Sequence, residues 1–165
     1  MTDTENQRAG FAAIIGAPNA GKSTLVNRLT GTKVSIVTQK VQTTRFPVRG
    51  IAIEGSAQIV LVDTPGIFTP RRRLDRAMVA SAWGGASDAD VVVHLIDAAS
   101  HIASEGKEGQ AADRRLAEDT ETIIANLKAS GTQVILALNK IDGMRRDTLL
   151  ALSHALFETG VYSEV

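Results

Sequence analysis

Short uninterrupted apolar runs alternate along this chain with longer stretches in which apolar residues recur every three or four positions. Uninterrupted runs of this length are typical of strands that are buried on both faces of a sheet. The runs occupy 11–15, 59–62, 90–96 and 134–138, and the segment 48–53 alternates as an edge strand would. The pattern therefore predicts strands that are separated by helical stretches.

Helical spacing of apolar residues fills the intervals between these runs. The residues expected on apolar helix faces are Leu25, Val26, Leu29, Leu74, Met78, Ala82, Leu116, Ile123, Ile124, Leu127, Leu149, Leu152, Leu156 and Phe157. The polar stretches 38–45, 68–73 and 98–115 are interpreted as surface loops or loose helix starts. Strands alternating with helices predict an α/β fold with a mainly parallel sheet, one antiparallel edge strand and helices on both faces. In such a sheet a ligand binds outside the carboxyl ends of the strands.

The composition suits one ordinary domain with a proper core, since the 165 residues are 44% apolar. Lys and Arg number 18 and balance 18 Asp and Glu, so no overall field favours nucleic acid. The absence of cysteine excludes disulfides and thiolate metal sites. The start of the chain, 1–7, is polar and acidic, unlike a secretory signal, and no apolar run is long enough to span a membrane. We expect a soluble, cytoplasmic protein.

The first candidate site directly follows the apolar run 11–15. Residues 16–23 fit GxxxxGK followed by Ser or Thr, the pattern of a phosphate-binding loop that opens a helix. Lys22 is expected to reach the β- and γ-phosphates, and Ser23 offers a hydroxyl to Mg²⁺. The residues expected around the nucleotide are Gly16, Ala17, Pro18, Asn19, Ala20, Gly21, Lys22, Ser23 and Thr24. The alternative is an ordinary glycine turn before a helix.

The second candidate site consists of Asp63, Thr64, Pro65 and Gly66, directly after the run 59–62. Asp63 at a strand end can hold Mg²⁺ through a water, and Gly66 has the backbone freedom to bring its N–H up to a γ-phosphate. A plain turn without a ligand is the alternative. The position after a buried strand, downstream of a phosphate loop, favours the functional interpretation.

The third candidate site, Asn139-Lys140-Ile141-Asp142, follows the run 134–138 and would select the base. The Asp142 carboxylate can accept hydrogen bonds from the guanine N1–H and 2-amino group, which adenine does not present. Asn139 can bond the base and tie back to the phosphate loop, while the Lys140 stem covers one face of the ring. The alternatives are a helix start capped by Asp142 and an Asp-Gly turn.

A fourth candidate, Gln42-Thr43-Thr44-Arg45, lies in the polar stretch before the edge strand. A threonine hydroxyl there could meet Mg²⁺ only when a γ-phosphate is present, which would make the segment a switch. On its own, a threonine pair is a weak signal and is better explained by a polar loop.

These segments together resemble the Era family within the TrmE–Era–Der group of bacterial GTPases, and the resemblance covers nearly the whole chain. It implies a P-loop NTPase fold of the Ras-like G-domain type that binds GTP, GDP and Mg²⁺ and hydrolyses GTP to GDP and phosphate. By the family's pattern Thr44 joins Ser23 and Asp63 around the metal. The whole protein would act in assembly of the small ribosomal subunit. It would also associate peripherally with the inner face of the cell membrane.

Two positions shape the expected mechanism. Ile67 stands where Ras-like enzymes carry the glutamine that orients the attacking water, so we expect slow intrinsic hydrolysis. The resemblance implies that Asn19 instead helps to hold a potassium ion, K⁺, against the phosphates. Lys22, Thr44 and Gly66 complete the expected catalytic set. For Asn19 the alternative is a loop residue that makes a local hydrogen bond.

The family pattern also predicts what this chain lacks. A fifth guanine-binding segment, the last parallel strand, the final helix and an RNA-binding KH domain are not recognisable before Val165. We expect a polar tail at 1–9 and an incomplete GTP-binding domain at 10–165, with small-subunit ribosomal RNA and the ribosome bound through the absent domain. The alternatives are a TrmE- or Der-like GTPase and a guanine-nucleotide-binding module with negligible hydrolysis.

Two residues are interpreted as structural. His94 lies within the run 90–96 and is expected to be a core histidine with satisfied hydrogen bonds, because lone histidines among apolar residues are seldom ligands. Trp83, the single tryptophan, is expected to end a helix before Gly84 and Gly85 and to pack against the core.

Overall fold

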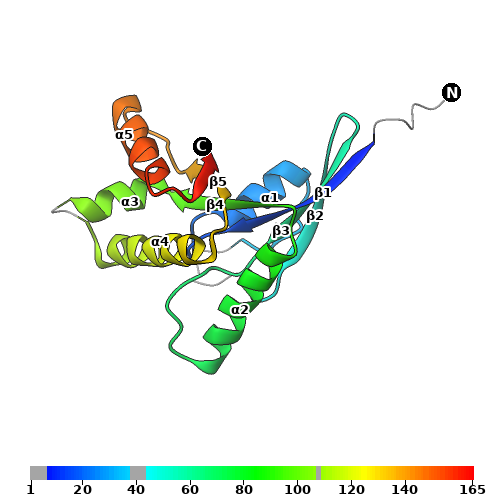
Figure 1. The fold of residues 1–165 in the computed structure, drawn as a ribbon, viewed down its shortest axis with the longest axis horizontal. Helices are drawn as coiled ribbons and strands as arrows, with labels where there is room; N and C mark the ends of the chain where they lie inside the picture. Colours follow the sequence, from blue (N-terminus) through cyan, green and yellow to red (C-terminus); the bar gives the residue numbers. More distant parts are fainter. Residues whose placement is uncertain (1–6, 38–43, 107–108) are drawn as a thin grey trace.

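The computed structural model describes residues 7–37, 44–106 and 109–165. Its elements in chain order are β1 (Arg8–Ile15), α1 (Lys22–Thr30), β2 (Val48–Glu54), β3 (Ala57–Asp63), α2 (Arg73–Ser87), β4 (Val91–Asp97), α3 (Ala98–Glu105), α4 (Ala111–Ser130), β5 (Val134–Asn139), α5 (Arg146–Phe157) and β6 (Tyr162–Glu164). The β2–β3 hairpin and the start of β1 project beyond the helices, on the side where the N-terminus lies (Figure 1).

The strands form one six-stranded sheet in the order β2-β3-β1-β4-β5-β6. Strand β1 pairs parallel with β3 and β4, β4 with β5, and β5 with β6, whereas β2 pairs antiparallel with β3. The predicted fold, a mainly parallel sheet with one antiparallel edge strand, is confirmed. Each strand expected from the apolar runs is present, with small differences in its ends.

Adjacent residues of a strand face opposite sides of the sheet, and this alternation builds two cores. Ile14 packs in the smaller cluster with Val26 of α1, on one face. Ile15 belongs to the larger cluster on the other face, which includes Ala82 of α2 and Ile123 of α4. Helices therefore cover both faces, as predicted.

The prediction that the last parallel strand is missing is wrong. Strand β6 pairs parallel with β5, where Tyr162 lies opposite Val134. Val161 and Tyr162 are both buried in the larger core. With three residues, β6 is too short to give an apolar run, so its pairing depends on the neighbouring strand rather than on a local pattern.

Helix α2 also differs from the prediction. It continues through Gly84 and Gly85 to Ser87 instead of ending at Trp83, which packs against the larger core as expected. Glycine weakens a helix interior, but Gly85 lies close to β3, since a Cβ built on it would be 3.3 Å from Thr64 Cγ2. Packing against the sheet thus outweighs the local preference to end the helix.

Two further boundaries differ. Helix α3 forms at the start of the stretch 98–115, which the polar pattern assigns to loops or helix starts. Asp97 caps this helix, since its Oδ1 accepts a hydrogen bond from the Ser100 N–H at 3.0 Å. Strand β1 begins at Arg8, inside the predicted tail, because the β2–β3 hairpin supplies a partner as far as Ala57.

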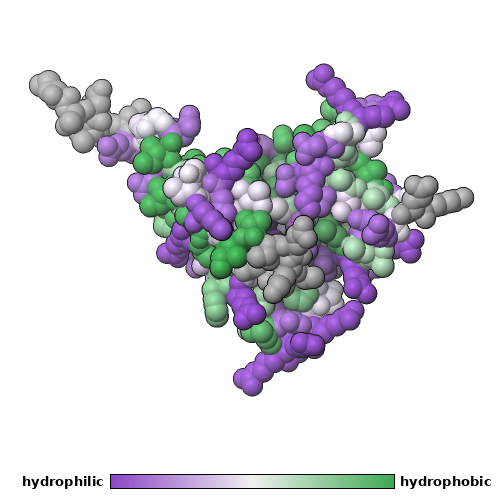
Figure 2. All heavy atoms as spheres, turned by 180° about the vertical axis from the view of Figure 1, so that it is seen from behind, coloured by the Kyte–Doolittle hydropathy of each residue, from purple (hydrophilic) through white to green (hydrophobic). Residues whose placement is uncertain are grey.

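The surface carries isolated apolar side chains among many polar ones. Figure 2 shows one face of the molecule, on which hydrophilic residues lie between smaller hydrophobic areas. On the projecting strands, Phe11, Ile51 and Ile53 are all exposed. Within the described ranges, no helix combines the length and the apolar character that crossing a membrane requires.

Candidate functional site

The predicted site segments meet at one edge of the sheet. Asp63 ends β3, Asp97 ends β4 and Asn139 ends β5. The register places Asp63 opposite Ile14, just before the phosphate loop, and places Asp97 opposite Asn139. Parallel strands share their carboxyl edge, so segments that are far apart in the chain become neighbours there.

The phosphate loop, residues 16–23, joins β1 to α1. Gly21 caps α1 with a left-handed backbone, φ 103°, which favours glycine. The Lys22 ammonium donates to the Ala17 carbonyl at 2.8 Å and is buried. Burial lowers the pKa of Lys22 to about 8, while attraction to Asp63 opposes the shift. A buried cation at a helix N-terminus can exchange this carbonyl for a phosphate oxygen.

Three oxygen-bearing side chains meet beside this lysine. Ser23 Oγ donates to Asp63 Oδ2 at 2.6 Å, and Thr44 Oγ1 lies 3.1 Å from Ser23 Oγ and 3.2 Å from the same carboxylate oxygen. All three side chains are buried, and Asp63 Oδ1 has no hydrogen-bond partner among the described residues. A buried oxygen without a partner is costly, and hydroxyl and carboxylate oxygens are ligands that Mg²⁺ accepts. The donor set therefore fits the predicted metal.

The turn after Asp63 packs against the phosphate loop. Thr64 Oγ1 donates to the Ile14 carbonyl at 2.7 Å, which fixes the start of the turn on β1. A Cβ built on Gly66 would lie 2.8 Å from Pro18 Cα. The absent side chain of Gly66 thus allows a close approach of the two loops.

Ile67 bonds to the phosphate loop through its backbone. Its N–H donates to the Gly16 carbonyl at 3.0 Å. Its side chain is 1% exposed and belongs to the larger core, together with Ile15 and Ala82. A core side chain thus occupies the position at which Ras-like enzymes orient water.

The third predicted segment also bonds to the phosphate loop. Asn139 Nδ2 donates to the Ala20 carbonyl at 2.9 Å, so the predicted tie is present. The Lys140 ammonium donates to the Asn19 carbonyl at 2.8 Å. Asp142 is exposed, which leaves its carboxylate accessible to a ligand. The phosphate loop and the expected base-binding segment are therefore one connected unit.

Some predicted residues contribute less to this arrangement. Gln42 and Thr43 lie outside the described residues, so Thr44 and Arg45 represent the switch segment. Thr24 is exposed on α1. No hydrogen bond from its side chain to the other site segments is found in the described part of the chain.

Sequence reasoning missed Asp97. This carboxylate is 2% exposed, and its Oδ2 lies 2.7 Å from the Lys140 ammonium. A signal was present, because Asp97 directly follows the run 90–96, as Asp63 and Asn139 follow theirs. Strand-end position alone marks it as a candidate.

His94 is a buried core histidine, as expected. Its Nδ1 lies 2.9 Å from the Tyr162 hydroxyl, although its Nε2 has no partner among the described residues. Burial, reinforced by electrostatic effects of Lys22 and His101, lowers the pKa of His94 to about 3. A neutral imidazole therefore joins β4 to β6 beneath the site.

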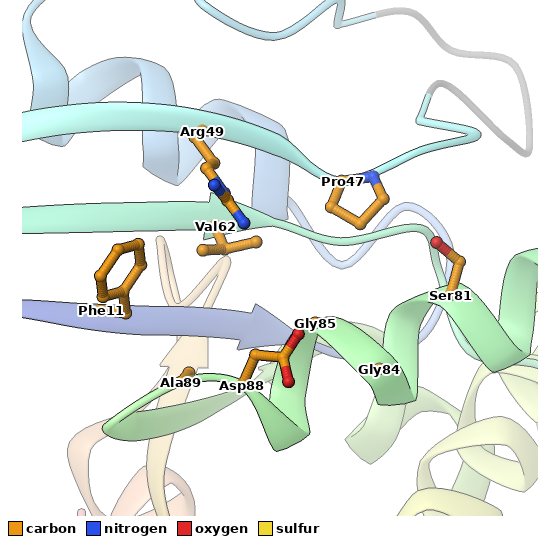
Figure 3. A pocket seen from close by; sticks show the side chains of 9 residues that line it. All are labelled: Phe11, Pro47, Arg49, Val62, Ser81, Gly84, Gly85, Asp88 and Ala89. Atoms are coloured by element: carbon orange, nitrogen blue, oxygen red, sulfur yellow. The ribbon is translucent and has the colours of Figure 1, made fainter.

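The cavities formed by the described residues include two of about 400 Å³. One adjoins the phosphate loop, where Pro18 and Asn19 line it together with residues of α4. The other lies between α2 and strands β1 to β3, and Arg49 stacks over Phe11 at its edge (Figure 3). None of the predicted site residues lines the second cavity. Val62, which does line it, directly precedes Asp63 in the chain.

The phosphate loop between β1 and α1, the oxygen cluster at Asp63 and the tied-back segment at Asn139 define a P-loop nucleotide-binding domain. Residues 11–140 match the family described as 50S ribosome-binding GTPase, which is most of the chain. The chain belongs to this family.

The most similar relatives include two proteins named GTPase Era. The one from Caulobacter vibrioides (strain NA1000 / CB15N) is 67% identical over 166 residues, and the one from Maricaulis maris (strain MCS10) is 57% identical over 165 residues. Each alignment covers 100% of this chain and 52% of the relative. The resemblance to Era is thus confirmed, and the chain spans about half the length of the curated relatives it matches.

Solved structures of Era are similar as well. Era in complex with MgGDPNP and nucleotides 1506–1542 of 16S ribosomal RNA is 36% identical with a TM-score of 0.77, covering 96% of this chain and 50% of that one. A variant of Aquifex aeolicus Era bound to GDP and AlF4⁻ is 34% identical with a TM-score of 0.72, covering 96% and 51%. The predicted G-domain fold is confirmed.

Proposed function

We propose that this chain binds GTP and GDP with Mg²⁺ and hydrolyses GTP to GDP and phosphate as a molecular switch. The observation that carries the proposal is the meeting of Ser23, Thr44 and Asp63 beside Lys22. These residues come from separate segments of the chain, and their oxygens would hold a magnesium ion, which would supply positive charge at the phosphates. Membership of a GTPase family supports the same function.

Each residue of the cluster has a defined role in this proposal. Ser23 and Thr44 would hold Mg²⁺ directly and Asp63 through a water; when bound, the ion neutralises charge on the phosphate oxygens. Lys22 exchanges its loop carbonyl for phosphate oxygens, and Gly66 presents its N–H to the γ-phosphate. Loss of that phosphate removes a partner of the Thr44 and Gly66 segments, and both are released.

Guanine would be selected by the segment that ends in Asp142. Its exposed carboxylate accepts the guanine N1–H and 2-amino protons, Asn139 bonds the base, and the Lys140 stem lies along the ring. A polar site whose groups would go unpaired rejects the wrong base by about 10⁴-fold or more. Adenine nucleotides should therefore bind far more weakly.

Calorimetric titration of the chain with GDP and with ADP, each with Mg²⁺, tests this function. GDP should bind, and ADP should bind weakly or not at all. Asp142→Asn should remove the preference for GDP. Asp147→Asn should behave as wild type, because Asp147 is an exposed residue of α5 whose carboxylate pairs with Arg145. A preference for ADP, or equal binding of both nucleotides, would refute the proposal.

We infer that Asn19 supports hydrolysis by helping to hold K⁺ against the phosphates. Ile67 is buried in the core and cannot orient water, so catalysis must come from another group or a partner, and a cation at the phosphates would stabilise the charge of the transition state. Multiple-turnover phosphate release in potassium and sodium buffers of equal ionic strength tests the idea. Faster turnover in potassium supports it, and equal turnover refutes it. No release above buffer in either salt would favour a guanine-nucleotide-binding module without hydrolysis.

For the whole protein we propose a role in small-subunit assembly, with ribosomal RNA bound through a region beyond this chain. One Era neighbour contains both MgGDPNP and a segment of 16S ribosomal RNA. Gel-shift titration of the full-length protein with that RNA segment, in GDPNP and in GDP, tests the role; no binding in either state contradicts it. A cytoplasmic location and a peripheral membrane association are proposed from the resemblance, and cell fractionation tests both.

A further inference from the structure

Two residues with an unusual backbone are bonded to each other across the site. Asn19 has a φ of 61° and Lys140 a φ of 56°, and they are the two non-glycine residues with positive φ in the described ranges. The Lys140 ammonium donates to the Asn19 carbonyl at 2.8 Å. Side chains seldom adopt this conformation unless the surrounding structure holds it. Their contact joins the phosphate loop to the segment that begins at Asn139.

Asp97 contacts the Lys140 end of this link. It ends β4, where the register pairs it with Asn139, the residue before Lys140. Its Oδ2 lies 2.7 Å from the Lys140 ammonium, and its Oδ1 accepts from the Ser100 N–H at 3.0 Å. The ammonium is thus held between the Asp97 carboxylate and the Asn19 carbonyl.

Helix capping alone does not explain this carboxylate. A cap requires one oxygen, and a serine hydroxyl serves that role as well as a carboxylate does. The side chain of Asp97 is 2% exposed, and burying a full negative charge is costly unless it is paired. The second oxygen and the charge are explained by Lys140, whose side chain is 46% exposed and whose ammonium also donates to the Asn19 carbonyl of the phosphate loop.

We propose that Asp97 is a positioning residue for guanine binding. Its carboxylate fixes the tip of Lys140 before nucleotide arrives, so that the lysine stem is already oriented along the plane of the base. A free lysine side chain would lose rotamer freedom on binding, and this loss is avoided when the side chain is held in advance. The same contact holds the Asn19 turn from the base side. The inference rests on the proposed guanine nucleotide function.

The experiment titrates GDP with Mg²⁺ against the wild type, Asp97→Asn, Asp97→Glu, Lys140→Met and the double variant Asp97→Asn with Lys140→Met. Asparagine keeps the shape and the cap but turns an N–H₂ group toward the ammonium, whereas glutamate keeps the charge. Asp113→Asn is the matched control, because this carboxylate accepts from the Gln110 N–H at 3.0 Å at the start of α4 and forms no ion pair with a lysine among the described residues. Thermal unfolding without nucleotide is measured for every variant.

Asp97→Asn should weaken GDP binding by about 10- to 100-fold, and Asp97→Glu should recover part of the loss. Asp113→Asn should bind as the wild type does. In the Lys140→Met background, Asp97→Asn should change affinity by less than about 2-fold, because a residue that acts through Lys140 has no effect once the ammonium is gone. A purely structural role would instead give equal losses in both backgrounds and a lower unfolding temperature.

Wild-type affinity in Asp97→Asn, or additive losses in the double variant, would overturn the inference. If Asp97→Asn does not fold, Asp97→Ser replaces it, because serine keeps the cap and is too short to reach Lys140. Failure of the wild type to bind GDP would overturn the proposed function and this inference together, whereas normal wild-type binding with unaffected variants would overturn the inference alone.

Discussion

Acid should destabilise this domain through His94, and the substitution His94→Gln isolates that effect. The imidazole is completely buried, and its Nδ1 lies 2.9 Å from the Tyr162 hydroxyl. Glutamine does not titrate, and its amide can still bond the tyrosine hydroxyl. The variant should therefore lose some packing at every pH but should lack the acid sensitivity of the wild type.

The magnitude follows from the pKa of His94. Burial lowers the pKa in the folded state from 6.5 to about 3, so between these values the unfolded chain binds a proton that the folded chain does not. The contribution of the neutral His94 to stability is then complete above pH 6.5 and is lost as the pH falls toward 3. The loss is about 1.4 kcal/mol per pH unit within that window, or about 2 kcal/mol between pH 7 and pH 5. The total free energy of unfolding of a small domain is only about 5–15 kcal/mol.

Urea unfolding at pH 7, 6 and 5, without nucleotide, measures the effect. The unfolding free energy of His94→Gln relative to the wild type should rise by about 2 kcal/mol from pH 7 to pH 5. His154→Gln is the control, because the His154 side chain is 79% exposed, and it should follow the wild-type pH dependence. Parallel curves for the wild type and His94→Gln would refute the reasoning, since His94 would then gain its proton equally in both states.

Tyr162→Phe removes the partner of His94 Nδ1, and we expect about 1–2 kcal/mol less stability in urea with GDP affinity unchanged; a loss of GDP affinity would contradict the purely structural role. Gly66→Ala places a Cβ 2.8 Å from Pro18 Cα, so the two loops must separate. In calorimetry the affinity for GDPNP should fall by about 10-fold or more and the affinity for GDP by less; equal losses of affinity would contradict a role of Gly66 at the γ-phosphate. Asn139→Ala removes the 2.9 Å hydrogen bond to the phosphate loop and should lower the affinity for GDP by about 10-fold. Wild-type affinity would contradict a role of Asn139 in nucleotide binding.

The main strands and the phosphate loop were predictable because their signals are local. A strand buried on both faces gives an apolar run, and the loop is a continuous stretch of residues with special backbone requirements. Asp63 and Asn139 could be placed for the same reason, since each directly follows such a run. The expected contact of Asn139 with the loop followed from the shared carboxyl edge of parallel strands.

The elements that were missed depend on contacts between distant segments. Strand β6 is held by pairing with β5 and by the Tyr162–His94 contact, neither of which leaves a local pattern. The extension of α2 through Gly84 and Gly85 depends on packing against β3. Tertiary contacts thus form a strand that has no local pattern in the first case and override a local preference in the second.

The order of the strands explains why the site can nevertheless be reconstructed from its parts. Because β1 lies between β3 and β4, the phosphate loop stands between Asp63 on one side and Asp97 and Asn139 on the other. In the proposed function this order separates the residues that would hold the metal from those that would bind the base, and it would thus set the direction of a bound nucleotide. It also makes Asp97 a neighbour of Lys140, which the spacing along the chain does not indicate. Strand ends identify the candidates, and the sheet order decides which of them act together.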